Sequence, residues 1–410
     1  MLSLKVLICG GGCAGPALAY WLARTGHDVT IVERFPALRA TGAQIDIRGQ
    51  GIEVIKRMDL DSAIRNKLVD EAGVSFVDSN GDVNATILAN KTGKGAQSLT
   101  SEYEIMRGDL VRILHQATHQ KVRYIFGRTI ETFEQDDSSH AVSVRFSDGS
   151  SGEYDILIGA DGQGSRIRKA ILSLDSPEPY RKLGIHMAYW FIPRDGTDDN
   201  IRKVYHGSKG RMIMRRTHNT AQTQVYFILK DDSPELSSIP QAPVETQKQY
   251  WYTRFQDAGW QTSRFLQGMK STENWFCQEV VQVQTDTWYK GHVVLLGDAS
   301  SCPSPFSGMG TTASLVGAYV LAGEINRNVN DLPQAFANYE EVFRPFVNEV
   351  QEINTFLLRL AIPQTWWGVA ILRFICWLLC FLRIPQQVSR FSKERDGDWK
   401  LPNYSELDKN

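Results

Sequence analysis

The sequence KVLICGGGCAGPALAYWLARTGHDVTIVER, residues 5–34, decides the fold of this chain. It begins with a short apolar run, continues with glycines spaced Gly10-x-Gly12-x-x-Gly15, and then places apolar residues at helical spacing. A second apolar run follows and ends at Glu33. This order predicts a strand, a tight turn, a helix and a second strand, which together open a parallel α/β sheet.

The glycines of this stretch have separate physical roles. Gly10 permits the tight turn, Gly12 allows the backbone to approach a pyrophosphate, and Gly15 lets the helix pack closely on the strand. The N-terminus of the helix offers free N–H groups and the positive end of its dipole to phosphates. Glu33 stands where a carboxylate accepts hydrogen bonds from a ribose. The stretch therefore predicts a Rossmann-like dinucleotide-binding unit.

Composition narrows the class of protein. A length of 410 residues suggests two domains, and the 42% hydrophobic content is sufficient for a full core. The net charge is −1 and no long charged run occurs, which argues against a nucleic-acid partner. The first strand begins near residue 4, so we expect no signal or transit peptide and a cytoplasmic protein. We expect no metal site and reduced, buried thiols, because zinc spacing is missing among Cys9, Cys13, Cys277, Cys302, Cys376 and Cys380.

Two later stretches repeat the pattern of strand, ligand-facing loop and helix. Residues 156–158 form an apolar run that ends in Asp161-Gly162 and leads into a helix. The alternative for Asp161 is a plain turn with an N-capping acid. Val293 to Leu296 form the second apolar run, followed by Gly297-Asp298, a Pro/Ser/Gly loop and a small-residue helix from Thr311 to Ile325. Open α/β sheets bind ligands at such carboxyl ends of their strands.

The rest of the sequence predicts an inserted domain that consists mainly of antiparallel strands. Alternating strands and proline-rich breaks replace the strand–helix units from Gly184 to Trp288, and residues 73–90 read as a hairpin around Asn80-Gly81. We expect helices at Gln50–Met58 and Pro333–Leu360 and an exposed loop over Lys91–Thr100. The fold class is α/β with an α+β insertion. The expected boundaries are 1–72, 101–183 and 289–345 for the Rossmann-like domain, 73–100 and 184–288 for the antiparallel insertion, 346–392 for a C-terminal helical segment, and 393–410 for a loose polar tail.

The apolar stretch from Trp366 to Ile384 is interrupted by Arg373 and Arg383. A charge near the middle of a span costs roughly 2.5–3.5 kcal/mol on insertion scales, which disfavours a transmembrane helix. Two alternatives follow: the helix packs across the two domains, or it rests on a membrane surface with its arginines at the headgroups. We expect packing, with membrane contact as the second choice, and a monomer or weak dimer.

The chain resembles the class A flavin monooxygenases, the para-hydroxybenzoate hydroxylase-like family, over about residues 4–350. The resemblance rests on the glycine motif with Glu33, on Asp161-Gly162-x-x-Ser165-x-x-Arg168, and on Gly297-Asp298 with Pro305-x-x-Gly308-x-Gly310. Within that family, ERFPALRATGAQIDIRGQG (residues 33–51) is similar to tetracycline-inactivating monooxygenases and relatives from microbial secondary metabolism. The family often has histidine at the position of Ser301, asparagine at Thr312 and aspartate at Gly317.

The resemblance implies FAD as the bound cofactor and NADPH or NADH as the reductant. By position, Glu33 would bind the ribose, Arg34 the adenine side and Asp298 the ribitol, and the loop from Pro305 to Thr311 would lie along the isoalloxazine. Arg39 matches an NADPH contact, and Asp161 would serve both cofactors. No catalytic side chain is assigned. The implied cofactor-binding residues are Gly10, Gly12, Ala14, Gly15, Glu33, Arg34, Arg39, Asp46, Arg107, Asp161, Asp298, Pro305, Gly308, Met309, Gly310 and Thr311.

The function implied by the resemblance is an FAD-dependent monooxygenase that uses NAD(P)H and O2, through a flavin C4a-hydroperoxide, to hydroxylate or epoxidise an aromatic or polyketide-like molecule. The alternatives are a flavin-linked oxidase or reductase, a halogenase, and a non-catalytic nucleotide-binding or membrane-associated protein. Several polar and aromatic residues of the inserted sheet are candidates for lining the substrate pocket, although a structural role is commoner for each: His186, Tyr189, His206, Arg211, Arg215 and Tyr226.

Overall fold

The computed structural model describes residues 2–89, 101–136, 141–173, 175–217, 219–384 and 398–408. A six-stranded sheet forms its first layer, in the order β17-β18-β11-β1-β2-β7, with every neighbouring pair parallel except β17 with β18. Its strands are β17 (Tyr289–Lys290), β18 (Val293–Leu295), β11 (Ile156–Gly159), β1 (Lys5–Cys9), β2 (Asp28–Glu33) and β7 (Arg123–Phe126). The predicted parallel unit of residues 5–34 therefore lies in the middle of the sheet.

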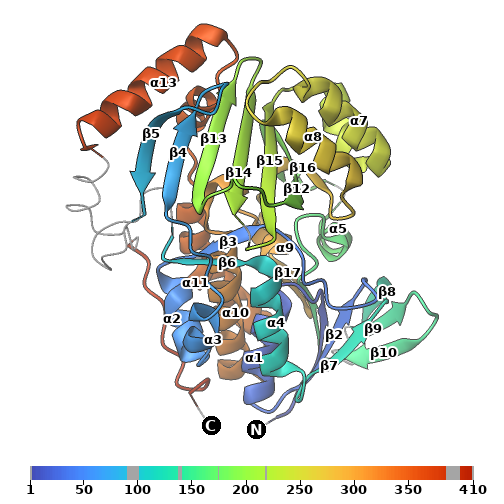
Figure 1. Ribbon diagram of the computed structural model, residues 1–410. Coiled ribbons are helices and arrows are strands. Elements are labelled where there is room, and N and C mark those ends of the chain that lie inside the picture. The colour runs from blue at the N-terminus through green and yellow to red at the C-terminus, as the bar shows by residue number, and fades with distance from the viewer. Residues whose placement is uncertain are drawn as a thin grey trace.

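Helices cover one face of this sheet and a smaller sheet covers the other (Figure 1). The helices α1 (Ala14–Arg24), α4 (Arg107–Thr118) and α10 (Gly310–Arg327) pack together, and α11 (Leu332–Gln351) packs on α10. On the other side, β10 (Ser151–Tyr154) touches β1 and β9 (Ala141–Phe146) touches β11. Because both faces are covered, the central strands are continuous apolar runs, and Val6, Leu7 and Ile8 are fully buried.

The inserted sheet has seven strands in the order β16-β12-β15-β14-β13-β4-β5, antiparallel except for β13 with β4. The predicted hairpin of residues 73–90 supplies β4 and β5 at one edge. The α/β fold with an antiparallel insertion is thus confirmed. The strands are β16 (Phe276–Val283), β12 (Tyr180–Pro193), β15 (Gln222–Lys230), β14 (Arg211–Thr217), β13 (Ile201–Gly207), β4 (Gly73–Val77) and β5 (Val83–Leu88).

The remaining elements are short or connect the two sheets. The predicted helix at Gln50–Met58 is present as α2, whereas the loop predicted over Lys91–Thr100 lies outside the described residues. The other bounds are β3 (Gln44–Ile47), β6 (Tyr103–Met106), β8 (Ile130–Asp136), α2 (Gln50–Arg57), α3 (Asp61–Arg65), α5 (Arg166–Ile171), α6 (Pro234–Ser238), η1 (Ile239–Gln241), α7 (Val244–Phe255), α8 (Thr262–Ser271), α9 (Asp298–Ser301), η2 (Pro305–Ser307), α12 (Thr355–Ala361) and α13 (Trp366–Phe381).

The seven-stranded sheet has two differently covered faces. Helices α7 and α8, which the strand-dominated pattern did not predict, cover the face that carries Trp190 and Phe227. The opposite face bears a separate apolar cluster around Tyr189 and Tyr226. Phe306 of η2 packs against that second cluster. The second face therefore looks toward the loops of the six-stranded sheet.

A buried group of ion pairs joins the inserted sheet to β6. Arg216 contacts Glu104 and Glu71, and Arg202 contacts Glu71 at 2.6 Å and Glu104 at 3.4 Å. Both guanidinium groups lower the pKa of Glu71, although burial acts in the opposite direction. Buried charges are tolerated only when they are paired in this way, so loss of one partner would leave an uncompensated charge.

The single helix predicted over Pro333–Leu360 is wrong in one respect, because it is broken between α11 and α12. Glu352 leaves helical geometry with ψ of 105°, and the side chain of Asn354 accepts a hydrogen bond from the N–H of Leu357, which starts α12. The apolar spacing continues through the break, which is why periodicity alone did not reveal it. No single helix of the described residues is long and apolar enough to cross a membrane. Taken together, α11–α12 and α13 have sufficient length and apolar composition, but the two parts are bent by 113° relative to each other.

The prediction of a loose polar tail is also wrong for the described residues 398–408. Tyr404 and Leu407 are fully buried, and the ring of Tyr404 lies against Gly323 of α10, where an added Cβ would be 2.3 Å from it. The hydroxyl of Tyr404 donates to Glu324 at 2.8 Å, and Trp399 donates to the carbonyl of Val342 at 2.8 Å. A few apolar residues anchor this segment to α10 and α11, although its overall composition is polar.

We predict that Tyr404→Ala destabilises the protein although it lies six positions before the last residue of the chain. Truncating a buried aromatic residue costs about 3–5 kcal/mol, and the urea midpoint should fall accordingly. The control Tyr404→Phe keeps the ring and removes only the hydrogen bond to Glu324, so it should cost about 1–3 kcal/mol. An unchanged midpoint for Tyr404→Ala would contradict the packing described above.

Candidate functional site

Three strand-to-helix loops meet at one edge of the six-stranded sheet. They follow β1, β11 and β18, whose parallel arrangement places their carboxyl ends side by side. Gly10 packs against the carbonyl of Ala160, since an added Cβ would lie 2.3 Å from that oxygen. Gly297 packs against Ala14 of α1, with a Cβ distance of 2.9 Å. The contacts are so close that no side chain fits between the loops.

The loop after β1 forms a cradle of free backbone. Gly10 has φ of +120°, and an added Cβ at Gly15 would lie 2.1 Å from the carbonyl oxygen of Gly10. A Cβ at Gly12 would meet only the guanidinium of Arg107, at 3.4 Å, and no backbone atom. The backbone at Gly12 is therefore approachable, while Gly10 and Gly15 are required by the fold itself. This arrangement fits a pyrophosphate group at the N-terminus of α1.

Glu33 ends β2 and holds the glycine loop in place. Its carboxylate accepts a hydrogen bond from the N–H of Gly11 at 2.8 Å and from the N–H of Phe35 at 3.1 Å. A carboxylate has about four acceptor positions, so two remain for the hydroxyls of a ribose. The guanidinium groups of Arg34 and Arg39 both lie over the ring of Phe35, at 5.0 and 4.8 Å.

Arg107 brings a positive charge to the cradle from the start of α4. One guanidinium nitrogen donates to the carbonyls of Arg39 and Thr41, at 3.2 and 2.8 Å, and the other faces Gly12. Gly42 is required beside it, because its φ is +135° and an added Cβ would lie 2.9 Å from the Arg107 side chain. The loop around Gly42 therefore holds Arg107 in a fixed direction.

Cys13, the N-cap residue of α1, lies between these groups. Burial raises the pKa of its thiol, and the nearby Arg107 only partly counteracts that effect. The thiol therefore stays neutral near pH 7. It adds no negative charge at the place where a phosphate would bind.

A second group of residues surrounds the N-terminus of α10. Asp46 of β3 pairs with Arg48 at 2.9 Å, and one of its oxygens would lie 3.3 Å from a Cβ at Gly308. The hydroxyl of Thr312 accepts from the N–H of Arg48 at 2.9 Å. Gly308 is left-handed with φ of +65°, and among the described residues no side chain caps α10. The first N–H groups of α10 are thus available to a ligand.

Asp298 is the buried acid of this site. One carboxylate oxygen would lie 3.9 Å from a Cβ at Gly310. Burial raises the pKa of Asp298, while the Cys302 thiol and the positive charge of Arg107 oppose that shift. In the described part of the chain it forms no ion pair within 4 Å. A desolvated carboxylate of this kind fits the hydroxyl groups of a sugar or ribitol chain.

Asp161 has the structural role that the sequence left open as an alternative. Its carboxylate accepts from the hydroxyl of Ser165 at 2.5 Å and from the N–H of Arg166 at 2.7 Å, so it helps to cap α5. Arg168 of the same motif is fully buried and donates to the carbonyl of Ala299 at 2.9 Å. The motif therefore ties the loop after β11 to α9. The structure brings Asp161 beside Gly10, with its N–H 3.2 Å from an added Cβ there.

Only some of the candidate pocket residues lie on the face of the inserted sheet that packs against Phe306. Tyr189 and Tyr226 belong to its apolar cluster, and His206 shares that face, where it stacks on Phe76. His186 alternates with Tyr189 and lies on the α7–α8 face. The remaining two are on that face as well and form ion pairs there: Arg211 with Asp257, and Arg215 with Asp198. His186, Arg211 and Arg215 are therefore excluded as pocket residues.

Sequence reasoning missed several residues near the apolar cluster. Met214 and Phe276 pack in it, and their alternation within their strands was the available signal. Gln44 of β3 is 6% exposed, and neither atom of its side-chain amide has a hydrogen-bond partner among the described residues. An unsatisfied buried amide costs about 1–3 kcal/mol, so Gln44 is suited to a polar atom of a ligand.

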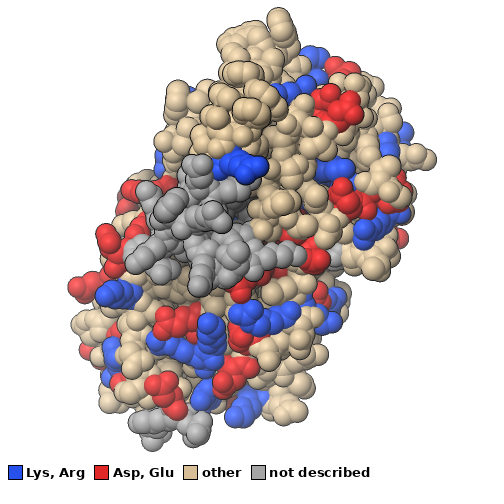
Figure 2. Space-filling view, turned by 60° about the vertical axis from the view of Figure 1, so that its left-hand side comes forward, with Lys and Arg blue, Asp and Glu red and all other residues tan. Residues whose placement is uncertain are grey.

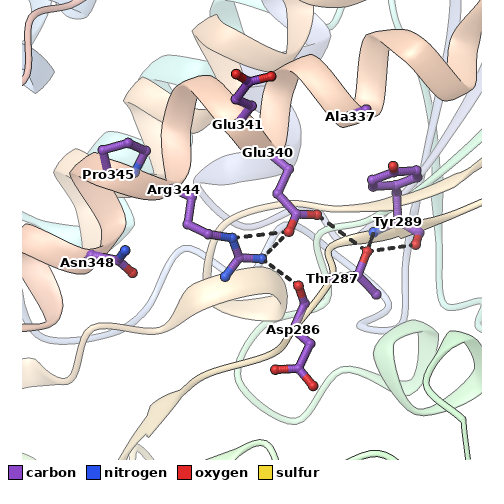
Figure 3. Close-up of a pocket in the computed structure, with 9 residues that line it drawn as sticks. All are labelled: Asp286, Thr287, Tyr289, Ala337, Glu340, Glu341, Arg344, Pro345 and Asn348. Carbon is purple, nitrogen blue, oxygen red and sulfur yellow. Dashed lines mark hydrogen bonds and ion pairs between the residues drawn. The ribbon is translucent and has the colours of Figure 1, made fainter.

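A separate hollow of about 520 Å³ lies between α11 and the segment before β17 (Figure 3). Its polar groups bind one another: Arg344 donates to Glu340 and to the carbonyl of Asp286, and the Thr287 hydroxyl donates to Tyr289. Arg344 also lies over the ring of Trp288 at 4.4 Å. The hollow does not include the three loops described above, and its contacts brace α11 against the sheet.

Comparison with known proteins agrees with this geometry. A family model described as "FAD binding domain" matches residues 3–352. The chain is 38% identical to the FAD-dependent monooxygenase asL4 of Sarocladium schorii, with 99% of each chain covered. It is 40% identical to the flavin-dependent monooxygenase eupH of a Phoma species, with 98% of each covered.

Solved structures show the same fold. The tetracycline destructase Tet(51) is 29% identical, with a TM-score of 0.77 and coverage of 98% of this chain and 100% of that one. Klebsiella pneumoniae HpxO, solved with FAD and uric acid, has a TM-score of 0.70 at 18% identity, covering 94% of this chain and 96% of that one. At that identity the likeness concerns the fold alone.

We predict that Gly12→Ala abolishes flavin retention without destabilising the apoprotein. A methyl group at this position would meet only the Arg107 guanidinium, at 3.4 Å, yet it would obstruct the approach of a pyrophosphate to the backbone. The readouts are flavin absorbance after purification and the melting temperature of the apoprotein. The control Gly164→Ala, whose Cβ meets nothing within 4 Å, should retain full flavin. Flavin retention by Gly12→Ala would place the pyrophosphate elsewhere.

We predict opposite effects of Asp298→Asn on stability and on cofactor binding. Burial raises the pKa of Asp298 in the folded protein. At pH values above the ordinary pKa of 3.8, the ionised carboxylate therefore lowers the stability of the apoprotein. A neutral amide should raise the melting temperature at neutral pH. Loss of a charge-assisted acceptor should weaken FAD binding by about tenfold or more. Calorimetry and flavin titration test these effects, with exposed Asp82→Asn as the control. A change of both quantities in the same direction would refute the assignment.

Proposed function

Because the chain belongs to the FAD binding domain family and to its FAD-dependent monooxygenases, we propose that it oxygenates an aromatic or polyketide-like small molecule with NADPH as the reductant. The observation that carries the proposal is the position of Phe306. It follows the Asp298 loop, precedes the N-terminus of α10, and packs against the aromatic face of the inserted sheet. The residues proposed to bind the cofactor therefore adjoin an apolar surface.

The residues present fit FAD. The cradle at Gly10, Gly12 and Gly15 would hold the pyrophosphate, Glu33 the adenosine ribose, and Asp298 the ribitol. Arg107 would neutralise phosphate charge beside Gly12. When bound, FAD supplies hydride acceptance and the activation of dioxygen. The remaining proposed contacts are Ala14, Arg34, Asp46, Asp161, Pro305, Gly308, Met309, Gly310 and Thr311.

The protein's own contribution to the proposed reaction is to orient the bound molecules and to stabilise charge on them. The N-terminus of α10 presents uncapped N–H groups and the positive end of the helix dipole, which favour negative charge on a bound ring system. Asp46 is paired with Arg48 and therefore adds little net negative charge there. The apolar cluster around Tyr189 and Tyr226 would exclude water from the reacting atoms.

The composition of that cluster supports an aromatic substrate. The rings of Tyr189 and Phe276 stack at 4.6 Å, and Tyr189 and Tyr226 lie 5.4 Å apart. The hydroxyl of Tyr226 donates to Gln224 at 2.7 Å, which fixes its direction. Buried Gln44 offers both a donor and an acceptor. A flat, apolar molecule with a few polar groups matches such a surface.

The proposed function is tested with the FAD-loaded enzyme, NADPH and a panel of phenolic and polyketide compounds. We expect substrate-dependent NADPH consumption and a product that contains one oxygen atom from isotope-labelled dioxygen, detected by mass. NADPH oxidation that yields only hydrogen peroxide with every compound would instead favour an oxidase. A protein that purifies without flavin and takes none up would refute both.

We predict that Arg39→Ala raises the KM for NADPH and leaves the flavin content unchanged. Arg39 lies over the Phe35 ring at 4.8 Å, and its backbone carbonyl accepts from Arg107 at 3.2 Å, so we expect its charge to meet a second nucleotide beside the FAD site. The effect should be about tenfold, as for loss of one charged contact. Arg145→Ala, an exposed arginine of β9 paired with Glu131, is the matched control. Flavin loss with an unchanged KM would move Arg39 into the FAD site.

A further inference from the structure

Exposed apolar side chains concentrate at one place on the protein. Of the sixteen large hydrophobic residues exposed in the described ranges, twelve belong to α12, α13 and the residue that follows α13. Figure 2 shows a broad uncharged area at the top of the molecule, where α13 lies in Figure 1. The twelve residues, termed the apolar ridge, are Phe356, Leu357, Leu360, Trp366, Trp367, Ile371, Phe374, Ile375, Trp377, Leu379, Phe381 and Leu382.

The apolar ridge is held on the outside of the inserted sheet. Helix α13 packs on β5 and β13, and Val369 is its one buried residue. Arg373 points inward, donates to the carbonyl of His206 at 3.2 Å, and lies over the ring of Tyr205 at 5.7 Å. The expectation that this helix packs across both domains is therefore wrong, because its principal contacts lie on the inserted sheet alone. Trp366 remains 76% exposed and Phe381 68%.

So much exposed apolar surface requires a partner. A soluble monomer rarely exposes more than a few hundred Å² of contiguous apolar area. Helix α13 has sixteen residues and is about 24 Å long, shorter than the roughly 30 Å of a bilayer core. A helix of this length and composition lies in the plane of a membrane interface more readily than it spans one.

The charges near the apolar ridge identify the partner. The sequence from Ile353 to Ile384 contains no Asp or Glu, and its charged residues are Arg359, Arg373 and Arg383. A second copy of this chain, meeting the ridge with its own ridge, would bring like charges together and supply no counter-charge. Anionic lipid headgroups supply that counter-charge, and tryptophan is favoured at their depth.

We propose that the apolar ridge docks on the surface of an anionic lipid bilayer. Helices α12 and α13 lie in the interface with their aromatic side chains inserted among the acyl chains. Arg359 and Arg383 extend to the headgroup phosphates, while Arg373 stays bound to His206 and fixes the helix to the inserted sheet.

The test is sedimentation of the FAD-loaded full chain with vesicles of phosphatidylcholine, with or without phosphatidylglycerol. We expect sedimentation with the anionic vesicles, reduced by high salt and weaker with phosphatidylcholine alone. The double variant Phe374→Ser and Trp377→Ser should weaken binding by about tenfold or more. The control Leu2→Ser and Val244→Ser, which removes exposed apolar side chains elsewhere, should bind like the wild type. Substitution is preferred to truncation, because the buried Tyr404 lies beyond the ridge.

Three outcomes would overturn the proposal. The first is absence of binding to both kinds of vesicle, and the second is equal loss of binding in the ridge and control variants. The third is a dimer in sedimentation velocity that Phe374→Ser and Trp377→Ser dissociate, which would identify a second copy as the partner. Arg359→Gln with Arg383→Gln should remove the preference for anionic lipid. None of these measurements uses turnover, so they are independent of the proposed oxygenation.

Discussion

The rest of the structure depends on the close backbone contacts at the carboxyl edge of the six-stranded sheet. Gly10 lies against the carbonyl of Ala160, Gly15 against the carbonyl of Gly10, and Gly297 against Ala14. A single Cβ at any of these positions would force the loops apart. Because the loops follow three parallel strands, their spacing sets where α1 and α10 begin and where Asp298 lies. The two uncapped helix ends and the buried acid are consequences of that spacing.

The arrangement of charges at this edge lowers the stability of the apoprotein. Asp298 is desolvated, which raises its pKa, and the first N–H groups of α10 have no side-chain cap among the described residues. Cys13 stays neutral and Arg107 supplies a fixed positive charge. Groups that are poorly satisfied in the free chain are the ones that a charged, hydroxyl-rich ligand would satisfy. The same reasoning applies to Gln44 on the apolar side of the site.

The inserted sheet connects this site to the exterior. One face is filled by α7 and α8, and the other presents the aromatic cluster to Phe306 and the cofactor loops. Helix α13 packs on the edge strand β5 and on β13, the third strand from that edge, and Arg373 links the helix to His206. Burial and the charge of Arg373 lower the pKa of His206 to about 4, so it remains neutral at this junction near pH 7. The apolar ridge is thus attached to the domain that would bind the substrate.

The sequence by itself determined the parallel sheet, the three loops and the residue types at the edge proposed to bind the cofactor, because a glycine spacing and an apolar run are local properties of the chain. It also predicted the hairpin that becomes β4 and β5. Only the tertiary structure decided that Asp161 caps α5, that His186 lies on the covered face, and that Tyr404 fills a space beside Gly323. Periodicity shows that a residue is buried on a face, but it does not show which other element meets that face. The break before α12 and the placement of α13 were predicted wrongly for the same reason, since both depend on contacts between segments distant in sequence.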